Sequence, residues 1–204
     1  MNRILPRIAL AFVLLAGMLS PSRPAHAQAP DPAAATVQSF YDGLTSSMKA
    51  GGTVKSRYDK LKPVMDQTFD LPGMTALSVG ASWSTISEAD RKALVDAFSR
   101  FTIATYAHNF DSYHGEKFTV DPTVNQRGTD KYVKSDMKPA SGDAIAFNYR
   151  LHEAGGGWKI IDIYLAGNIS QLARSRADYA STLSSGGAQG LAKQISALAD
   201  KQFN

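Results

Sequence analysis

Residues 158–179 read WKIIDIYLAGNISQLARSRADY and contain a complete transition from a strand to a helix. The β-branched and aromatic residues of 158–166 are typical of a strand, and Gly167 ends that strand. Ser170 is a residue type that caps helix N-termini, so we expect a helix to begin there. The chain on either side of this transition can be interpreted from it.

The strand at 158–166 has a predicted partner directly before it. Residues 143–152 alternate between two faces, and one face carries Ile145, Phe147, Tyr149 and Leu151. The glycines at 155–157 separate the two stretches, which predicts that they pair as a hairpin. Two further strands, at 117–124 and 131–137, flank a turn at 127–130. The sequence therefore predicts an antiparallel sheet of about four strands.

Helical spacing of apolar residues accounts for most of the remaining chain. It appears at 37–48, 54–69 and 74–80, and again in a long helix that begins after Ser87 and is expected to continue to about residue 114. Residues 28–35 are rich in Pro and Ala and are predicted to be loose, and two C-terminal helices, 170–183 and 187–203, are predicted around the glycines at 186–187. Helices, then strands, then helices indicate an α+β fold with a curved antiparallel sheet.

The N-terminal 27 residues have the pattern of a cleavable signal peptide. Arg3 and Arg7 precede an apolar run at 8–19, and residues 24–28, PAHAQ, fit a signal peptidase site. The run is too short to cross a hydrocarbon layer of about 30 Å. The chain has no cysteine, which excludes disulfides and a lipid-modified cysteine. We expect a mature protein of residues 28–204 that is exported and released.

Charge and length limit the classes of protein to which the mature chain can belong. The whole sequence has 22 basic and 18 acidic residues, but Arg3, Arg7 and Arg23 all lie in the predicted signal peptide, which has no acidic residue. The mature chain is therefore nearly neutral, and we expect no nucleic-acid partner. Residues 28–204 have the length of one domain.

The sequence contains no recognisable catalytic motif. His108 and His114 are six residues apart, a spacing that does not place both on one face of a helix or match a metal-binding motif. A nucleophile elbow, a P-loop and a dinucleotide-binding fingerprint are also absent. We therefore expect a non-enzymatic protein without metal or cofactor. The alternative hypothesis is an isomerase or hydratase that uses His152, Asp162 and Tyr164 in a cavity.

Asp162 stands in an otherwise apolar run and requires a partner if it is buried. Arg174 and Arg176 follow in the next helix and are the predicted partners. Such a pair would clamp the turn between strand and helix, or the arginine could face a lipid phosphate, since a guanidinium binds oxygen atoms well. A third possibility is that Asp162 accepts hydrogen bonds from the backbone near the next helix.

Several segments, in this order, resemble one known family. They are residues 69–74, FDLPGM; Phe98 and Phe101 followed by Thr105-Tyr106-Ala107; Gly157-Trp158-Lys159 with Asp162; and Gly167, Ser170, Arg176 and Tyr179. The ordered set is similar to the periplasmic phospholipid-shuttle proteins of the Mla/toluene-tolerance type, the MlaC-like proteins. Asn168, Gln171 and Arg174-Ser175 depart from the usual pattern. These departures fit a divergent branch such as the one associated with hopanoid biosynthesis.

The resemblance implies a soluble periplasmic carrier with an apolar cavity between the sheet and the helices. Its cargo would be a phospholipid or a hopanoid-like lipid. Its partners would be the lipid-binding subunit of an inner-membrane ABC transporter and an outer-membrane lipoprotein complex. The alternative within this setting is a non-catalytic adaptor of a hopanoid pathway.

Aromatic and methionine side chains supply the predicted wall of that cavity. Methionine adapts to irregular apolar ligands, although the same pattern is more often ordinary core. The residues expected to contact lipid are Phe69, Leu71, Met74, Leu77, Trp83, Phe98, Phe101, Tyr106, Phe147, Tyr149, Ile161, Ile163 and Arg176.

Overall fold

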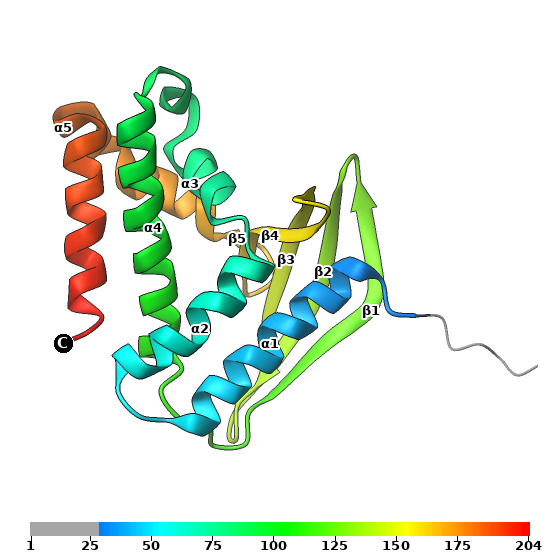
Figure 1. Cartoon of the computed structure of the whole chain (residues 1–204). Helices are drawn as coiled ribbons and strands as arrows, with labels where there is room; N and C mark the ends of the chain where they lie inside the picture. The colour runs from blue at the N-terminus through cyan, green and yellow to red at the C-terminus, as the bar shows by residue number, and fades with distance from the viewer. Residues whose placement is uncertain (1–28) are drawn as a thin grey trace, which may run out of the picture.

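The computed structural model describes residues 29–204, and the signal peptide predicted for residues 1–27 lies outside them. Helices come first, strands follow, and a long helix closes the chain (Figure 1), as the α+β prediction requires. The helical elements are α1 (Pro32–Ala50), α2 (Val54–Thr68), α3 (Leu71–Val79), the 3₁₀ helix η1 (Gly80–Thr85), α4 (Glu88–Asn109) and α5 (Gln171–Lys201).

The strands form one antiparallel sheet in which neighbours in sequence are neighbours in space. They are β1 (Lys117–Arg127), β2 (Asp130–Lys138), β3 (Ile145–Ala154), β4 (Gly157–Leu165) and β5 (Ile169–Ser170). The predicted hairpin is confirmed, and Gly155 and Gly156 both have positive φ, 61° and 79°, as its two-residue turn requires. The sheet has one strand more than the four expected, because the chain pairs briefly with β4 just before α5.

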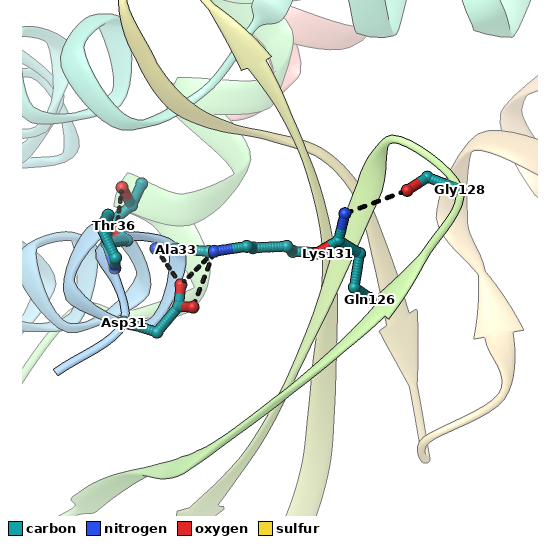
Figure 2. Close-up of polar contacts among 7 residues, drawn as sticks. Asp31, Ala33, Thr36, Gln126, Gly128 and Lys131 are labelled. Carbon is teal, nitrogen blue, oxygen red and sulfur yellow. Dashed lines mark hydrogen bonds and ion pairs between the residues drawn. The ribbon is translucent and has the colours of Figure 1, made fainter.

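The first helix begins earlier than predicted because Asp31 caps it. Ala33 N donates a hydrogen bond of 2.8 Å to Asp31 Oδ1, and Lys131 Nζ on β2 lies 2.7 Å from Asp31 Oδ2 (Figure 2). Burial alone would raise the pKa of Asp31, but the bonds from Lys131 and Ala33 outweigh it and lower that pKa. The prediction that residues 28–35 are loose is therefore wrong from Pro32 onward.

The long helix α4 ends at Asn109, a few residues before the predicted end. Phe110 leaves the helix and places its ring 5.7 Å from that of Tyr106 and 6.3 Å from that of Phe118 on β1. Tyr113 then lies beyond the helix and is exposed. Packing against the sheet therefore ends the helix at a point where its periodicity would allow it to continue.

The two C-terminal helices predicted around residues 184–187 form two halves of α5. Gly187 has a non-helical backbone with φ 62° and ψ −166°, a conformation that glycine adopts readily. The second half runs beside α4 (Figure 1), where Arg100 Nη2 lies 2.7 Å from Asp200 Oδ1. The first half crosses toward α3 and the end of β4.

One part of the core lies between α1 and the face of the sheet that α1 covers (Figure 1), and the core continues among α2, α4 and the second half of α5. Phe40 of α1 is fully buried at its centre, with its ring 4.9 Å from that of Phe69, 5.2 Å from Tyr106 and 6.3 Å from Tyr149. Edge-to-face contacts of this kind stabilise an aromatic cluster beyond the area that it buries. Within residues 29–204, none of the helices combines the length and the hydropathy needed to cross a bilayer.

Candidate functional site

An apolar pocket of about 360 Å³ lies where α3, α4, the first half of α5 and the strands β3 and β4 meet. Its volume falls in the range of about 300–1,000 Å³ that is typical of small-molecule sites. Hydrophobic and aromatic side chains dominate its wall, and the polar residues come from α4 and α5. The lining residues are Met74, Phe98, Phe101, Thr102, Thr105, Tyr106, Asn109, Phe110, Phe147, Ile163, Leu165, Gln171, Leu172, Ser175 and Tyr179.

Six of the thirteen residues expected to contact lipid line this pocket. They come from four elements that are far apart in the sequence, which the fold brings together around one space. The six are Met74, Phe98, Phe101, Tyr106, Phe147 and Ile163. The structure thus places these six residues around one hollow between the sheet and the helices, and their contact with lipid stays a prediction.

The other apolar candidates lie elsewhere. Phe69 and Leu71 are buried and line a different, surface groove between α2 and α4. Tyr149 and Ile161 are buried in the core, where β4 is covered on both faces. Phe147, which lines the pocket, and Tyr149, which lies in the core, are two residues apart on β3 and share one face of the strand, so alternation along the sequence could not separate them.

Leu77 and Trp83 also lie outside the pocket. Leu77 is half-buried on α3 and packs against the core. Trp83 lies in η1, with its ring centroid 5.5 Å from the guanidinium of Arg91, whose Nε donates a 3.0 Å hydrogen bond to Trp83 O. The tryptophan thus fixes the junction between η1 and α4.

Arg176 does not line the apolar pocket. Its Nε donates a hydrogen bond of 3.0 Å to the carbonyl oxygen of Leu77, and its Nη2 donates to the same oxygen. The guanidinium thus satisfies a carbonyl in the last turn of α3, where a positive charge also favours the helix dipole. Arg176 borders a second hollow between α3, η1 and α5.

The pocket includes residues that sequence reasoning missed. On α4, Thr102, Thr105 and Asn109 extend the wall, and on α5 the wall is formed by Leu172, Ser175 and Tyr179. Both sets follow helical spacing, so each could have been recognised as one face of its helix. The pattern was not recognised because most of these side chains are small or polar. Only Leu172 and Tyr179 are large and apolar enough to suggest a binding wall.

Asp162 is buried but does not pair with Arg174 or Arg176, so that prediction is wrong. Its Oδ1 accepts hydrogen bonds from the backbone N–H groups of Ile163 at 2.8 Å and Leu172 at 3.2 Å. The alternative in which Asp162 binds the backbone near the next helix is confirmed. Backbone N–H groups at a helix start satisfy a carboxylate without any cation.

His152 and Asp162 do not face each other across the hairpin. The strand register places Lys159 opposite His152 and Arg150 opposite Asp162. His152 Nε2 lies instead 2.8 Å from Asp70 Oδ2, at the N-terminus of α3. The pair on which the enzyme hypothesis depended is therefore not assembled, and residues 29–204 contain no group of acidic or His side chains arranged to bind a metal.

The two tyrosines that line the pocket are uncharged at neutral pH. Burial raises the pKa of Tyr179 to about 12, and it also raises the pKa of Tyr106. Both therefore keep their protons, and neither offers a phenolate to a reaction. The pocket can exclude water from an apolar ligand, and its side chains supply no base.

Comparison with known proteins agrees with this fold. The family model described as MlaC protein matches residues 35–197, whereas no curated protein matches. A solved structure, the phospholipid-binding protein from Ralstonia solanacearum in complex with a phospholipid, matches with a TM-score of 0.75 and 21% identity, over 85% of this chain and all of that one. This similarity shows a shared fold. Because the family model covers most of the sequence, this chain belongs to the MlaC family.

Proposed function

We propose that this protein is a periplasmic carrier that holds the acyl chains of a phospholipid in the apolar pocket. It takes lipid from, or delivers it to, the lipid-binding subunit of an inner-membrane ABC transporter and an outer-membrane lipoprotein complex. A hopanoid-like lipid is the alternative cargo. The carrier catalyses no reaction.

The observation that carries this proposal is the composition of the pocket wall. Phe98, Phe101, Phe147 and Ile163 present apolar surface, and the neighbouring tyrosines are neutral. The Ralstonia solanacearum protein of the same fold was solved with a phospholipid bound, which supports the same class of ligand here. Each methylene group removed from water contributes about 0.8 kcal/mol, so a lipid chain gains strongly from such a wall.

The size of the pocket limits how much of a lipid it holds in this conformation. One small group such as a methylene occupies about 30 Å³, the volume of a water molecule in the liquid. A space of 360 Å³ therefore accommodates about twelve carbon atoms of a lipid chain. A phospholipid with two ordinary membrane chains has more than twice that number of chain carbons. The pocket must therefore open further around such a ligand, or part of each chain must lie outside it.

Lipid extraction and transfer test the proposal directly. The mature protein, purified from a periplasmic fraction, is extracted with organic solvent, and the intact protein is weighed by native mass spectrometry. Phospholipid bound at one molecule per chain supports the carrier, and bound hopanoid identifies the alternative cargo. Movement of labelled phospholipid between two populations of vesicles, accelerated by the protein, would establish transport.

Two outcomes would contradict the carrier. Bare polypeptide, with no uptake of phospholipid or hopanoid from vesicles, would favour a protein adaptor. Chemical conversion of the bound lipid, lost in Asp162→Asn while lipid still binds, would favour an enzyme.

A further inference from the structure

A second hollow, of about 330 Å³, lies beside the apolar pocket and differs from it in chemistry. It is a surface groove bordered by the end of α3, by η1 and by the first half of α5, and its residues Ser82, Arg176 and Ser184 are exposed. Half of its lining residues are polar, namely Ser78, Ser82, Arg176 and Ser184. Tyr179 lines both hollows, so the polar and the apolar space share a wall.

Arg176 brings a positive charge to this polar hollow. Two of its N–H groups are directed to the carbonyl oxygen of Leu77, which holds the guanidinium in place. A guanidinium has five N–H donors, so donors remain for a ligand. Within residues 29–204, Arg176 has no carboxylate within ion-pair distance, and its charge is not neutralised by a salt bridge.

Gly80 leaves room for Arg176 at this position. Its φ is +75°, and a Cβ atom on it would lie 3.3 Å from Arg176 Nε. A side chain at residue 80 would therefore be strained in its own backbone and would crowd the guanidinium. The backbone at the start of η1 and the arginine therefore pack closely against each other beside the hollow.

We propose that this second hollow is a phosphate-binding subsite, with Arg176 as the principal contact and the hydroxyl groups of Ser82 and Ser184 as additional donors. A planar guanidinium is well suited to phosphate oxygens. The apolar pocket and the second hollow lie side by side, as the acyl chains and the phosphate do in a phospholipid. The inference rests on the proposed function and adds recognition of the headgroup phosphate to it.

The first test compares two ligands and two arginines. Binding of phosphatidylglycerol and of diacylglycerol with the same chains is measured for the wild type, Arg176→Gln and Arg174→Gln. Arg174 is exposed, lies two residues away and lines neither hollow, so it controls for overall charge. We expect Arg176→Gln to weaken phosphatidylglycerol binding by about tenfold or more, the usual effect of losing a charged hydrogen bond, and to leave diacylglycerol binding unchanged.

Because Arg176 also bonds to α3, a second pair of variants separates recognition from structure. Ser184→Asp places a carboxylate elsewhere on the α5 wall of the hollow without changing Arg176. Ser181→Asp adds the same charge at an exposed position that lines neither hollow. We expect only Ser184→Asp to weaken phosphatidylglycerol binding, again with diacylglycerol unaffected. If Arg176→Gln weakens the binding of both lipids equally, Arg176 has a structural role. If, in addition, Ser184→Asp does not change phosphatidylglycerol binding, the proposal is overturned.

A third arm identifies the source of the phosphate. Inorganic phosphate is titrated into lipid-free protein and into protein loaded with phosphatidylglycerol or diacylglycerol. We expect phosphate to bind the lipid-free and diacylglycerol-loaded forms but not the phosphatidylglycerol-loaded form, and Arg176→Gln to abolish this binding. That result would show that the headgroup and the free anion use the same subsite. If the wild type binds both lipids equally well, the inference about the headgroup is refuted and the proposed carrier function is unaffected. If the wild type binds neither lipid, the carrier function itself is refuted.

Discussion

Ser170 Oγ donates a hydrogen bond of 2.6 Å to Asp162 Oδ2, and the same hydroxyl oxygen accepts one of 3.0 Å from Ala173 N. Asp162 Oδ1 receives the backbone N–H groups of Ile163 and Leu172. One buried carboxylate thus joins the end of β4 to the start of α5. The next turns of α5 carry Ser175 and Tyr179 into the pocket, so this junction sets the position of one pocket wall.

Removing this carboxylate should destabilise the fold more than neutralising it. Asp162→Ala leaves three donors without their acceptor, and we expect a loss of about 2–4 kcal/mol in the free energy of unfolding. Asp162→Asn retains one oxygen atom for the two backbone donors and should lose about half as much. Urea denaturation followed by circular dichroism measures both, and an Asp162→Ala protein as stable as the wild type would contradict the role of the junction.

Filling the pocket from α4 should weaken lipid binding without harming the fold. Thr102 is half-buried in the pocket wall, and Thr102→Phe occupies space that a chain would use. Displacing only two methylene groups, at about 0.8 kcal/mol each, lowers the affinity for phospholipid by about tenfold. The matched control is Ala93→Phe, at an exposed position of α4 that lines none of the hollows described above. Equal affinities for the two variants in a fluorescent-lipid titration would place the lipid elsewhere.

Strongly alkaline solution should unfold the protein in part through Tyr179. An unfolded tyrosine loses its proton near pH 10, whereas burial raises the pKa of Tyr179 in the folded protein to about 12. Between these values the unfolded state binds fewer protons, so the stabilisation present below pH 10 is lost as the pH rises, by about 2–3 kcal/mol. Tyr179→Phe should flatten this part of the pH dependence, and Tyr113→Phe, which removes an exposed phenol, should not. Denaturation curves from pH 8 to 12 that coincide for wild type and Tyr179→Phe would refute the assignment.

The start of α3 should depend on Asp70 more than on its histidine partner. Asp70 Oδ1 accepts a hydrogen bond of 2.9 Å from Gly73 N and caps the helix, while Oδ2 lies 2.8 Å from His152 Nε2. We expect Asp70→Ala to cost about 1–2 kcal/mol, and Asp70→Asn, which can still cap, a few tenths. His152→Ala should cost about 1 kcal/mol or less, because its side chain is 31% exposed. Thermal unfolding ranks the three variants, and a His152→Ala protein less stable than Asp70→Ala would reverse this order of importance.

Elements specified by neighbouring residues could be predicted from the sequence. The two glycines of the β3–β4 turn, the Ser170 cap and the Gly187 break all act within a few residues of themselves. The early start of α1 was missed although its signal is local, since Asp31 caps Ala33 N and proline follows at the first helical position; the second partner of Asp31, Lys131, comes from a distant strand. The end of α4 was missed because Phe110 turns toward Phe118 on β1.

The candidate site was only half predictable. Apolar residues of α4 and β3 were expected to contact lipid, and Phe98, Phe101 and Phe147 do line the pocket. Phe69 and Tyr149 are equally apolar but face a groove or the core. Hydropathy measures the tendency of a side chain to leave water, and that tendency is the same for a core and for a pocket wall.

The sequence by itself determined the class of fold, the hairpins and caps, and the membership of the MlaC family, because these depend on spacing, turn chemistry and the order of segments. Only the tertiary structure decided which apolar side chains enclose an open space and which partners the charged groups take. Asp162 binds backbone N–H groups where an arginine was expected, and Arg176 joins α5 to α3. Such contacts depend on how helices and strands distant in sequence pack together, and no local pattern of residues encodes that arrangement.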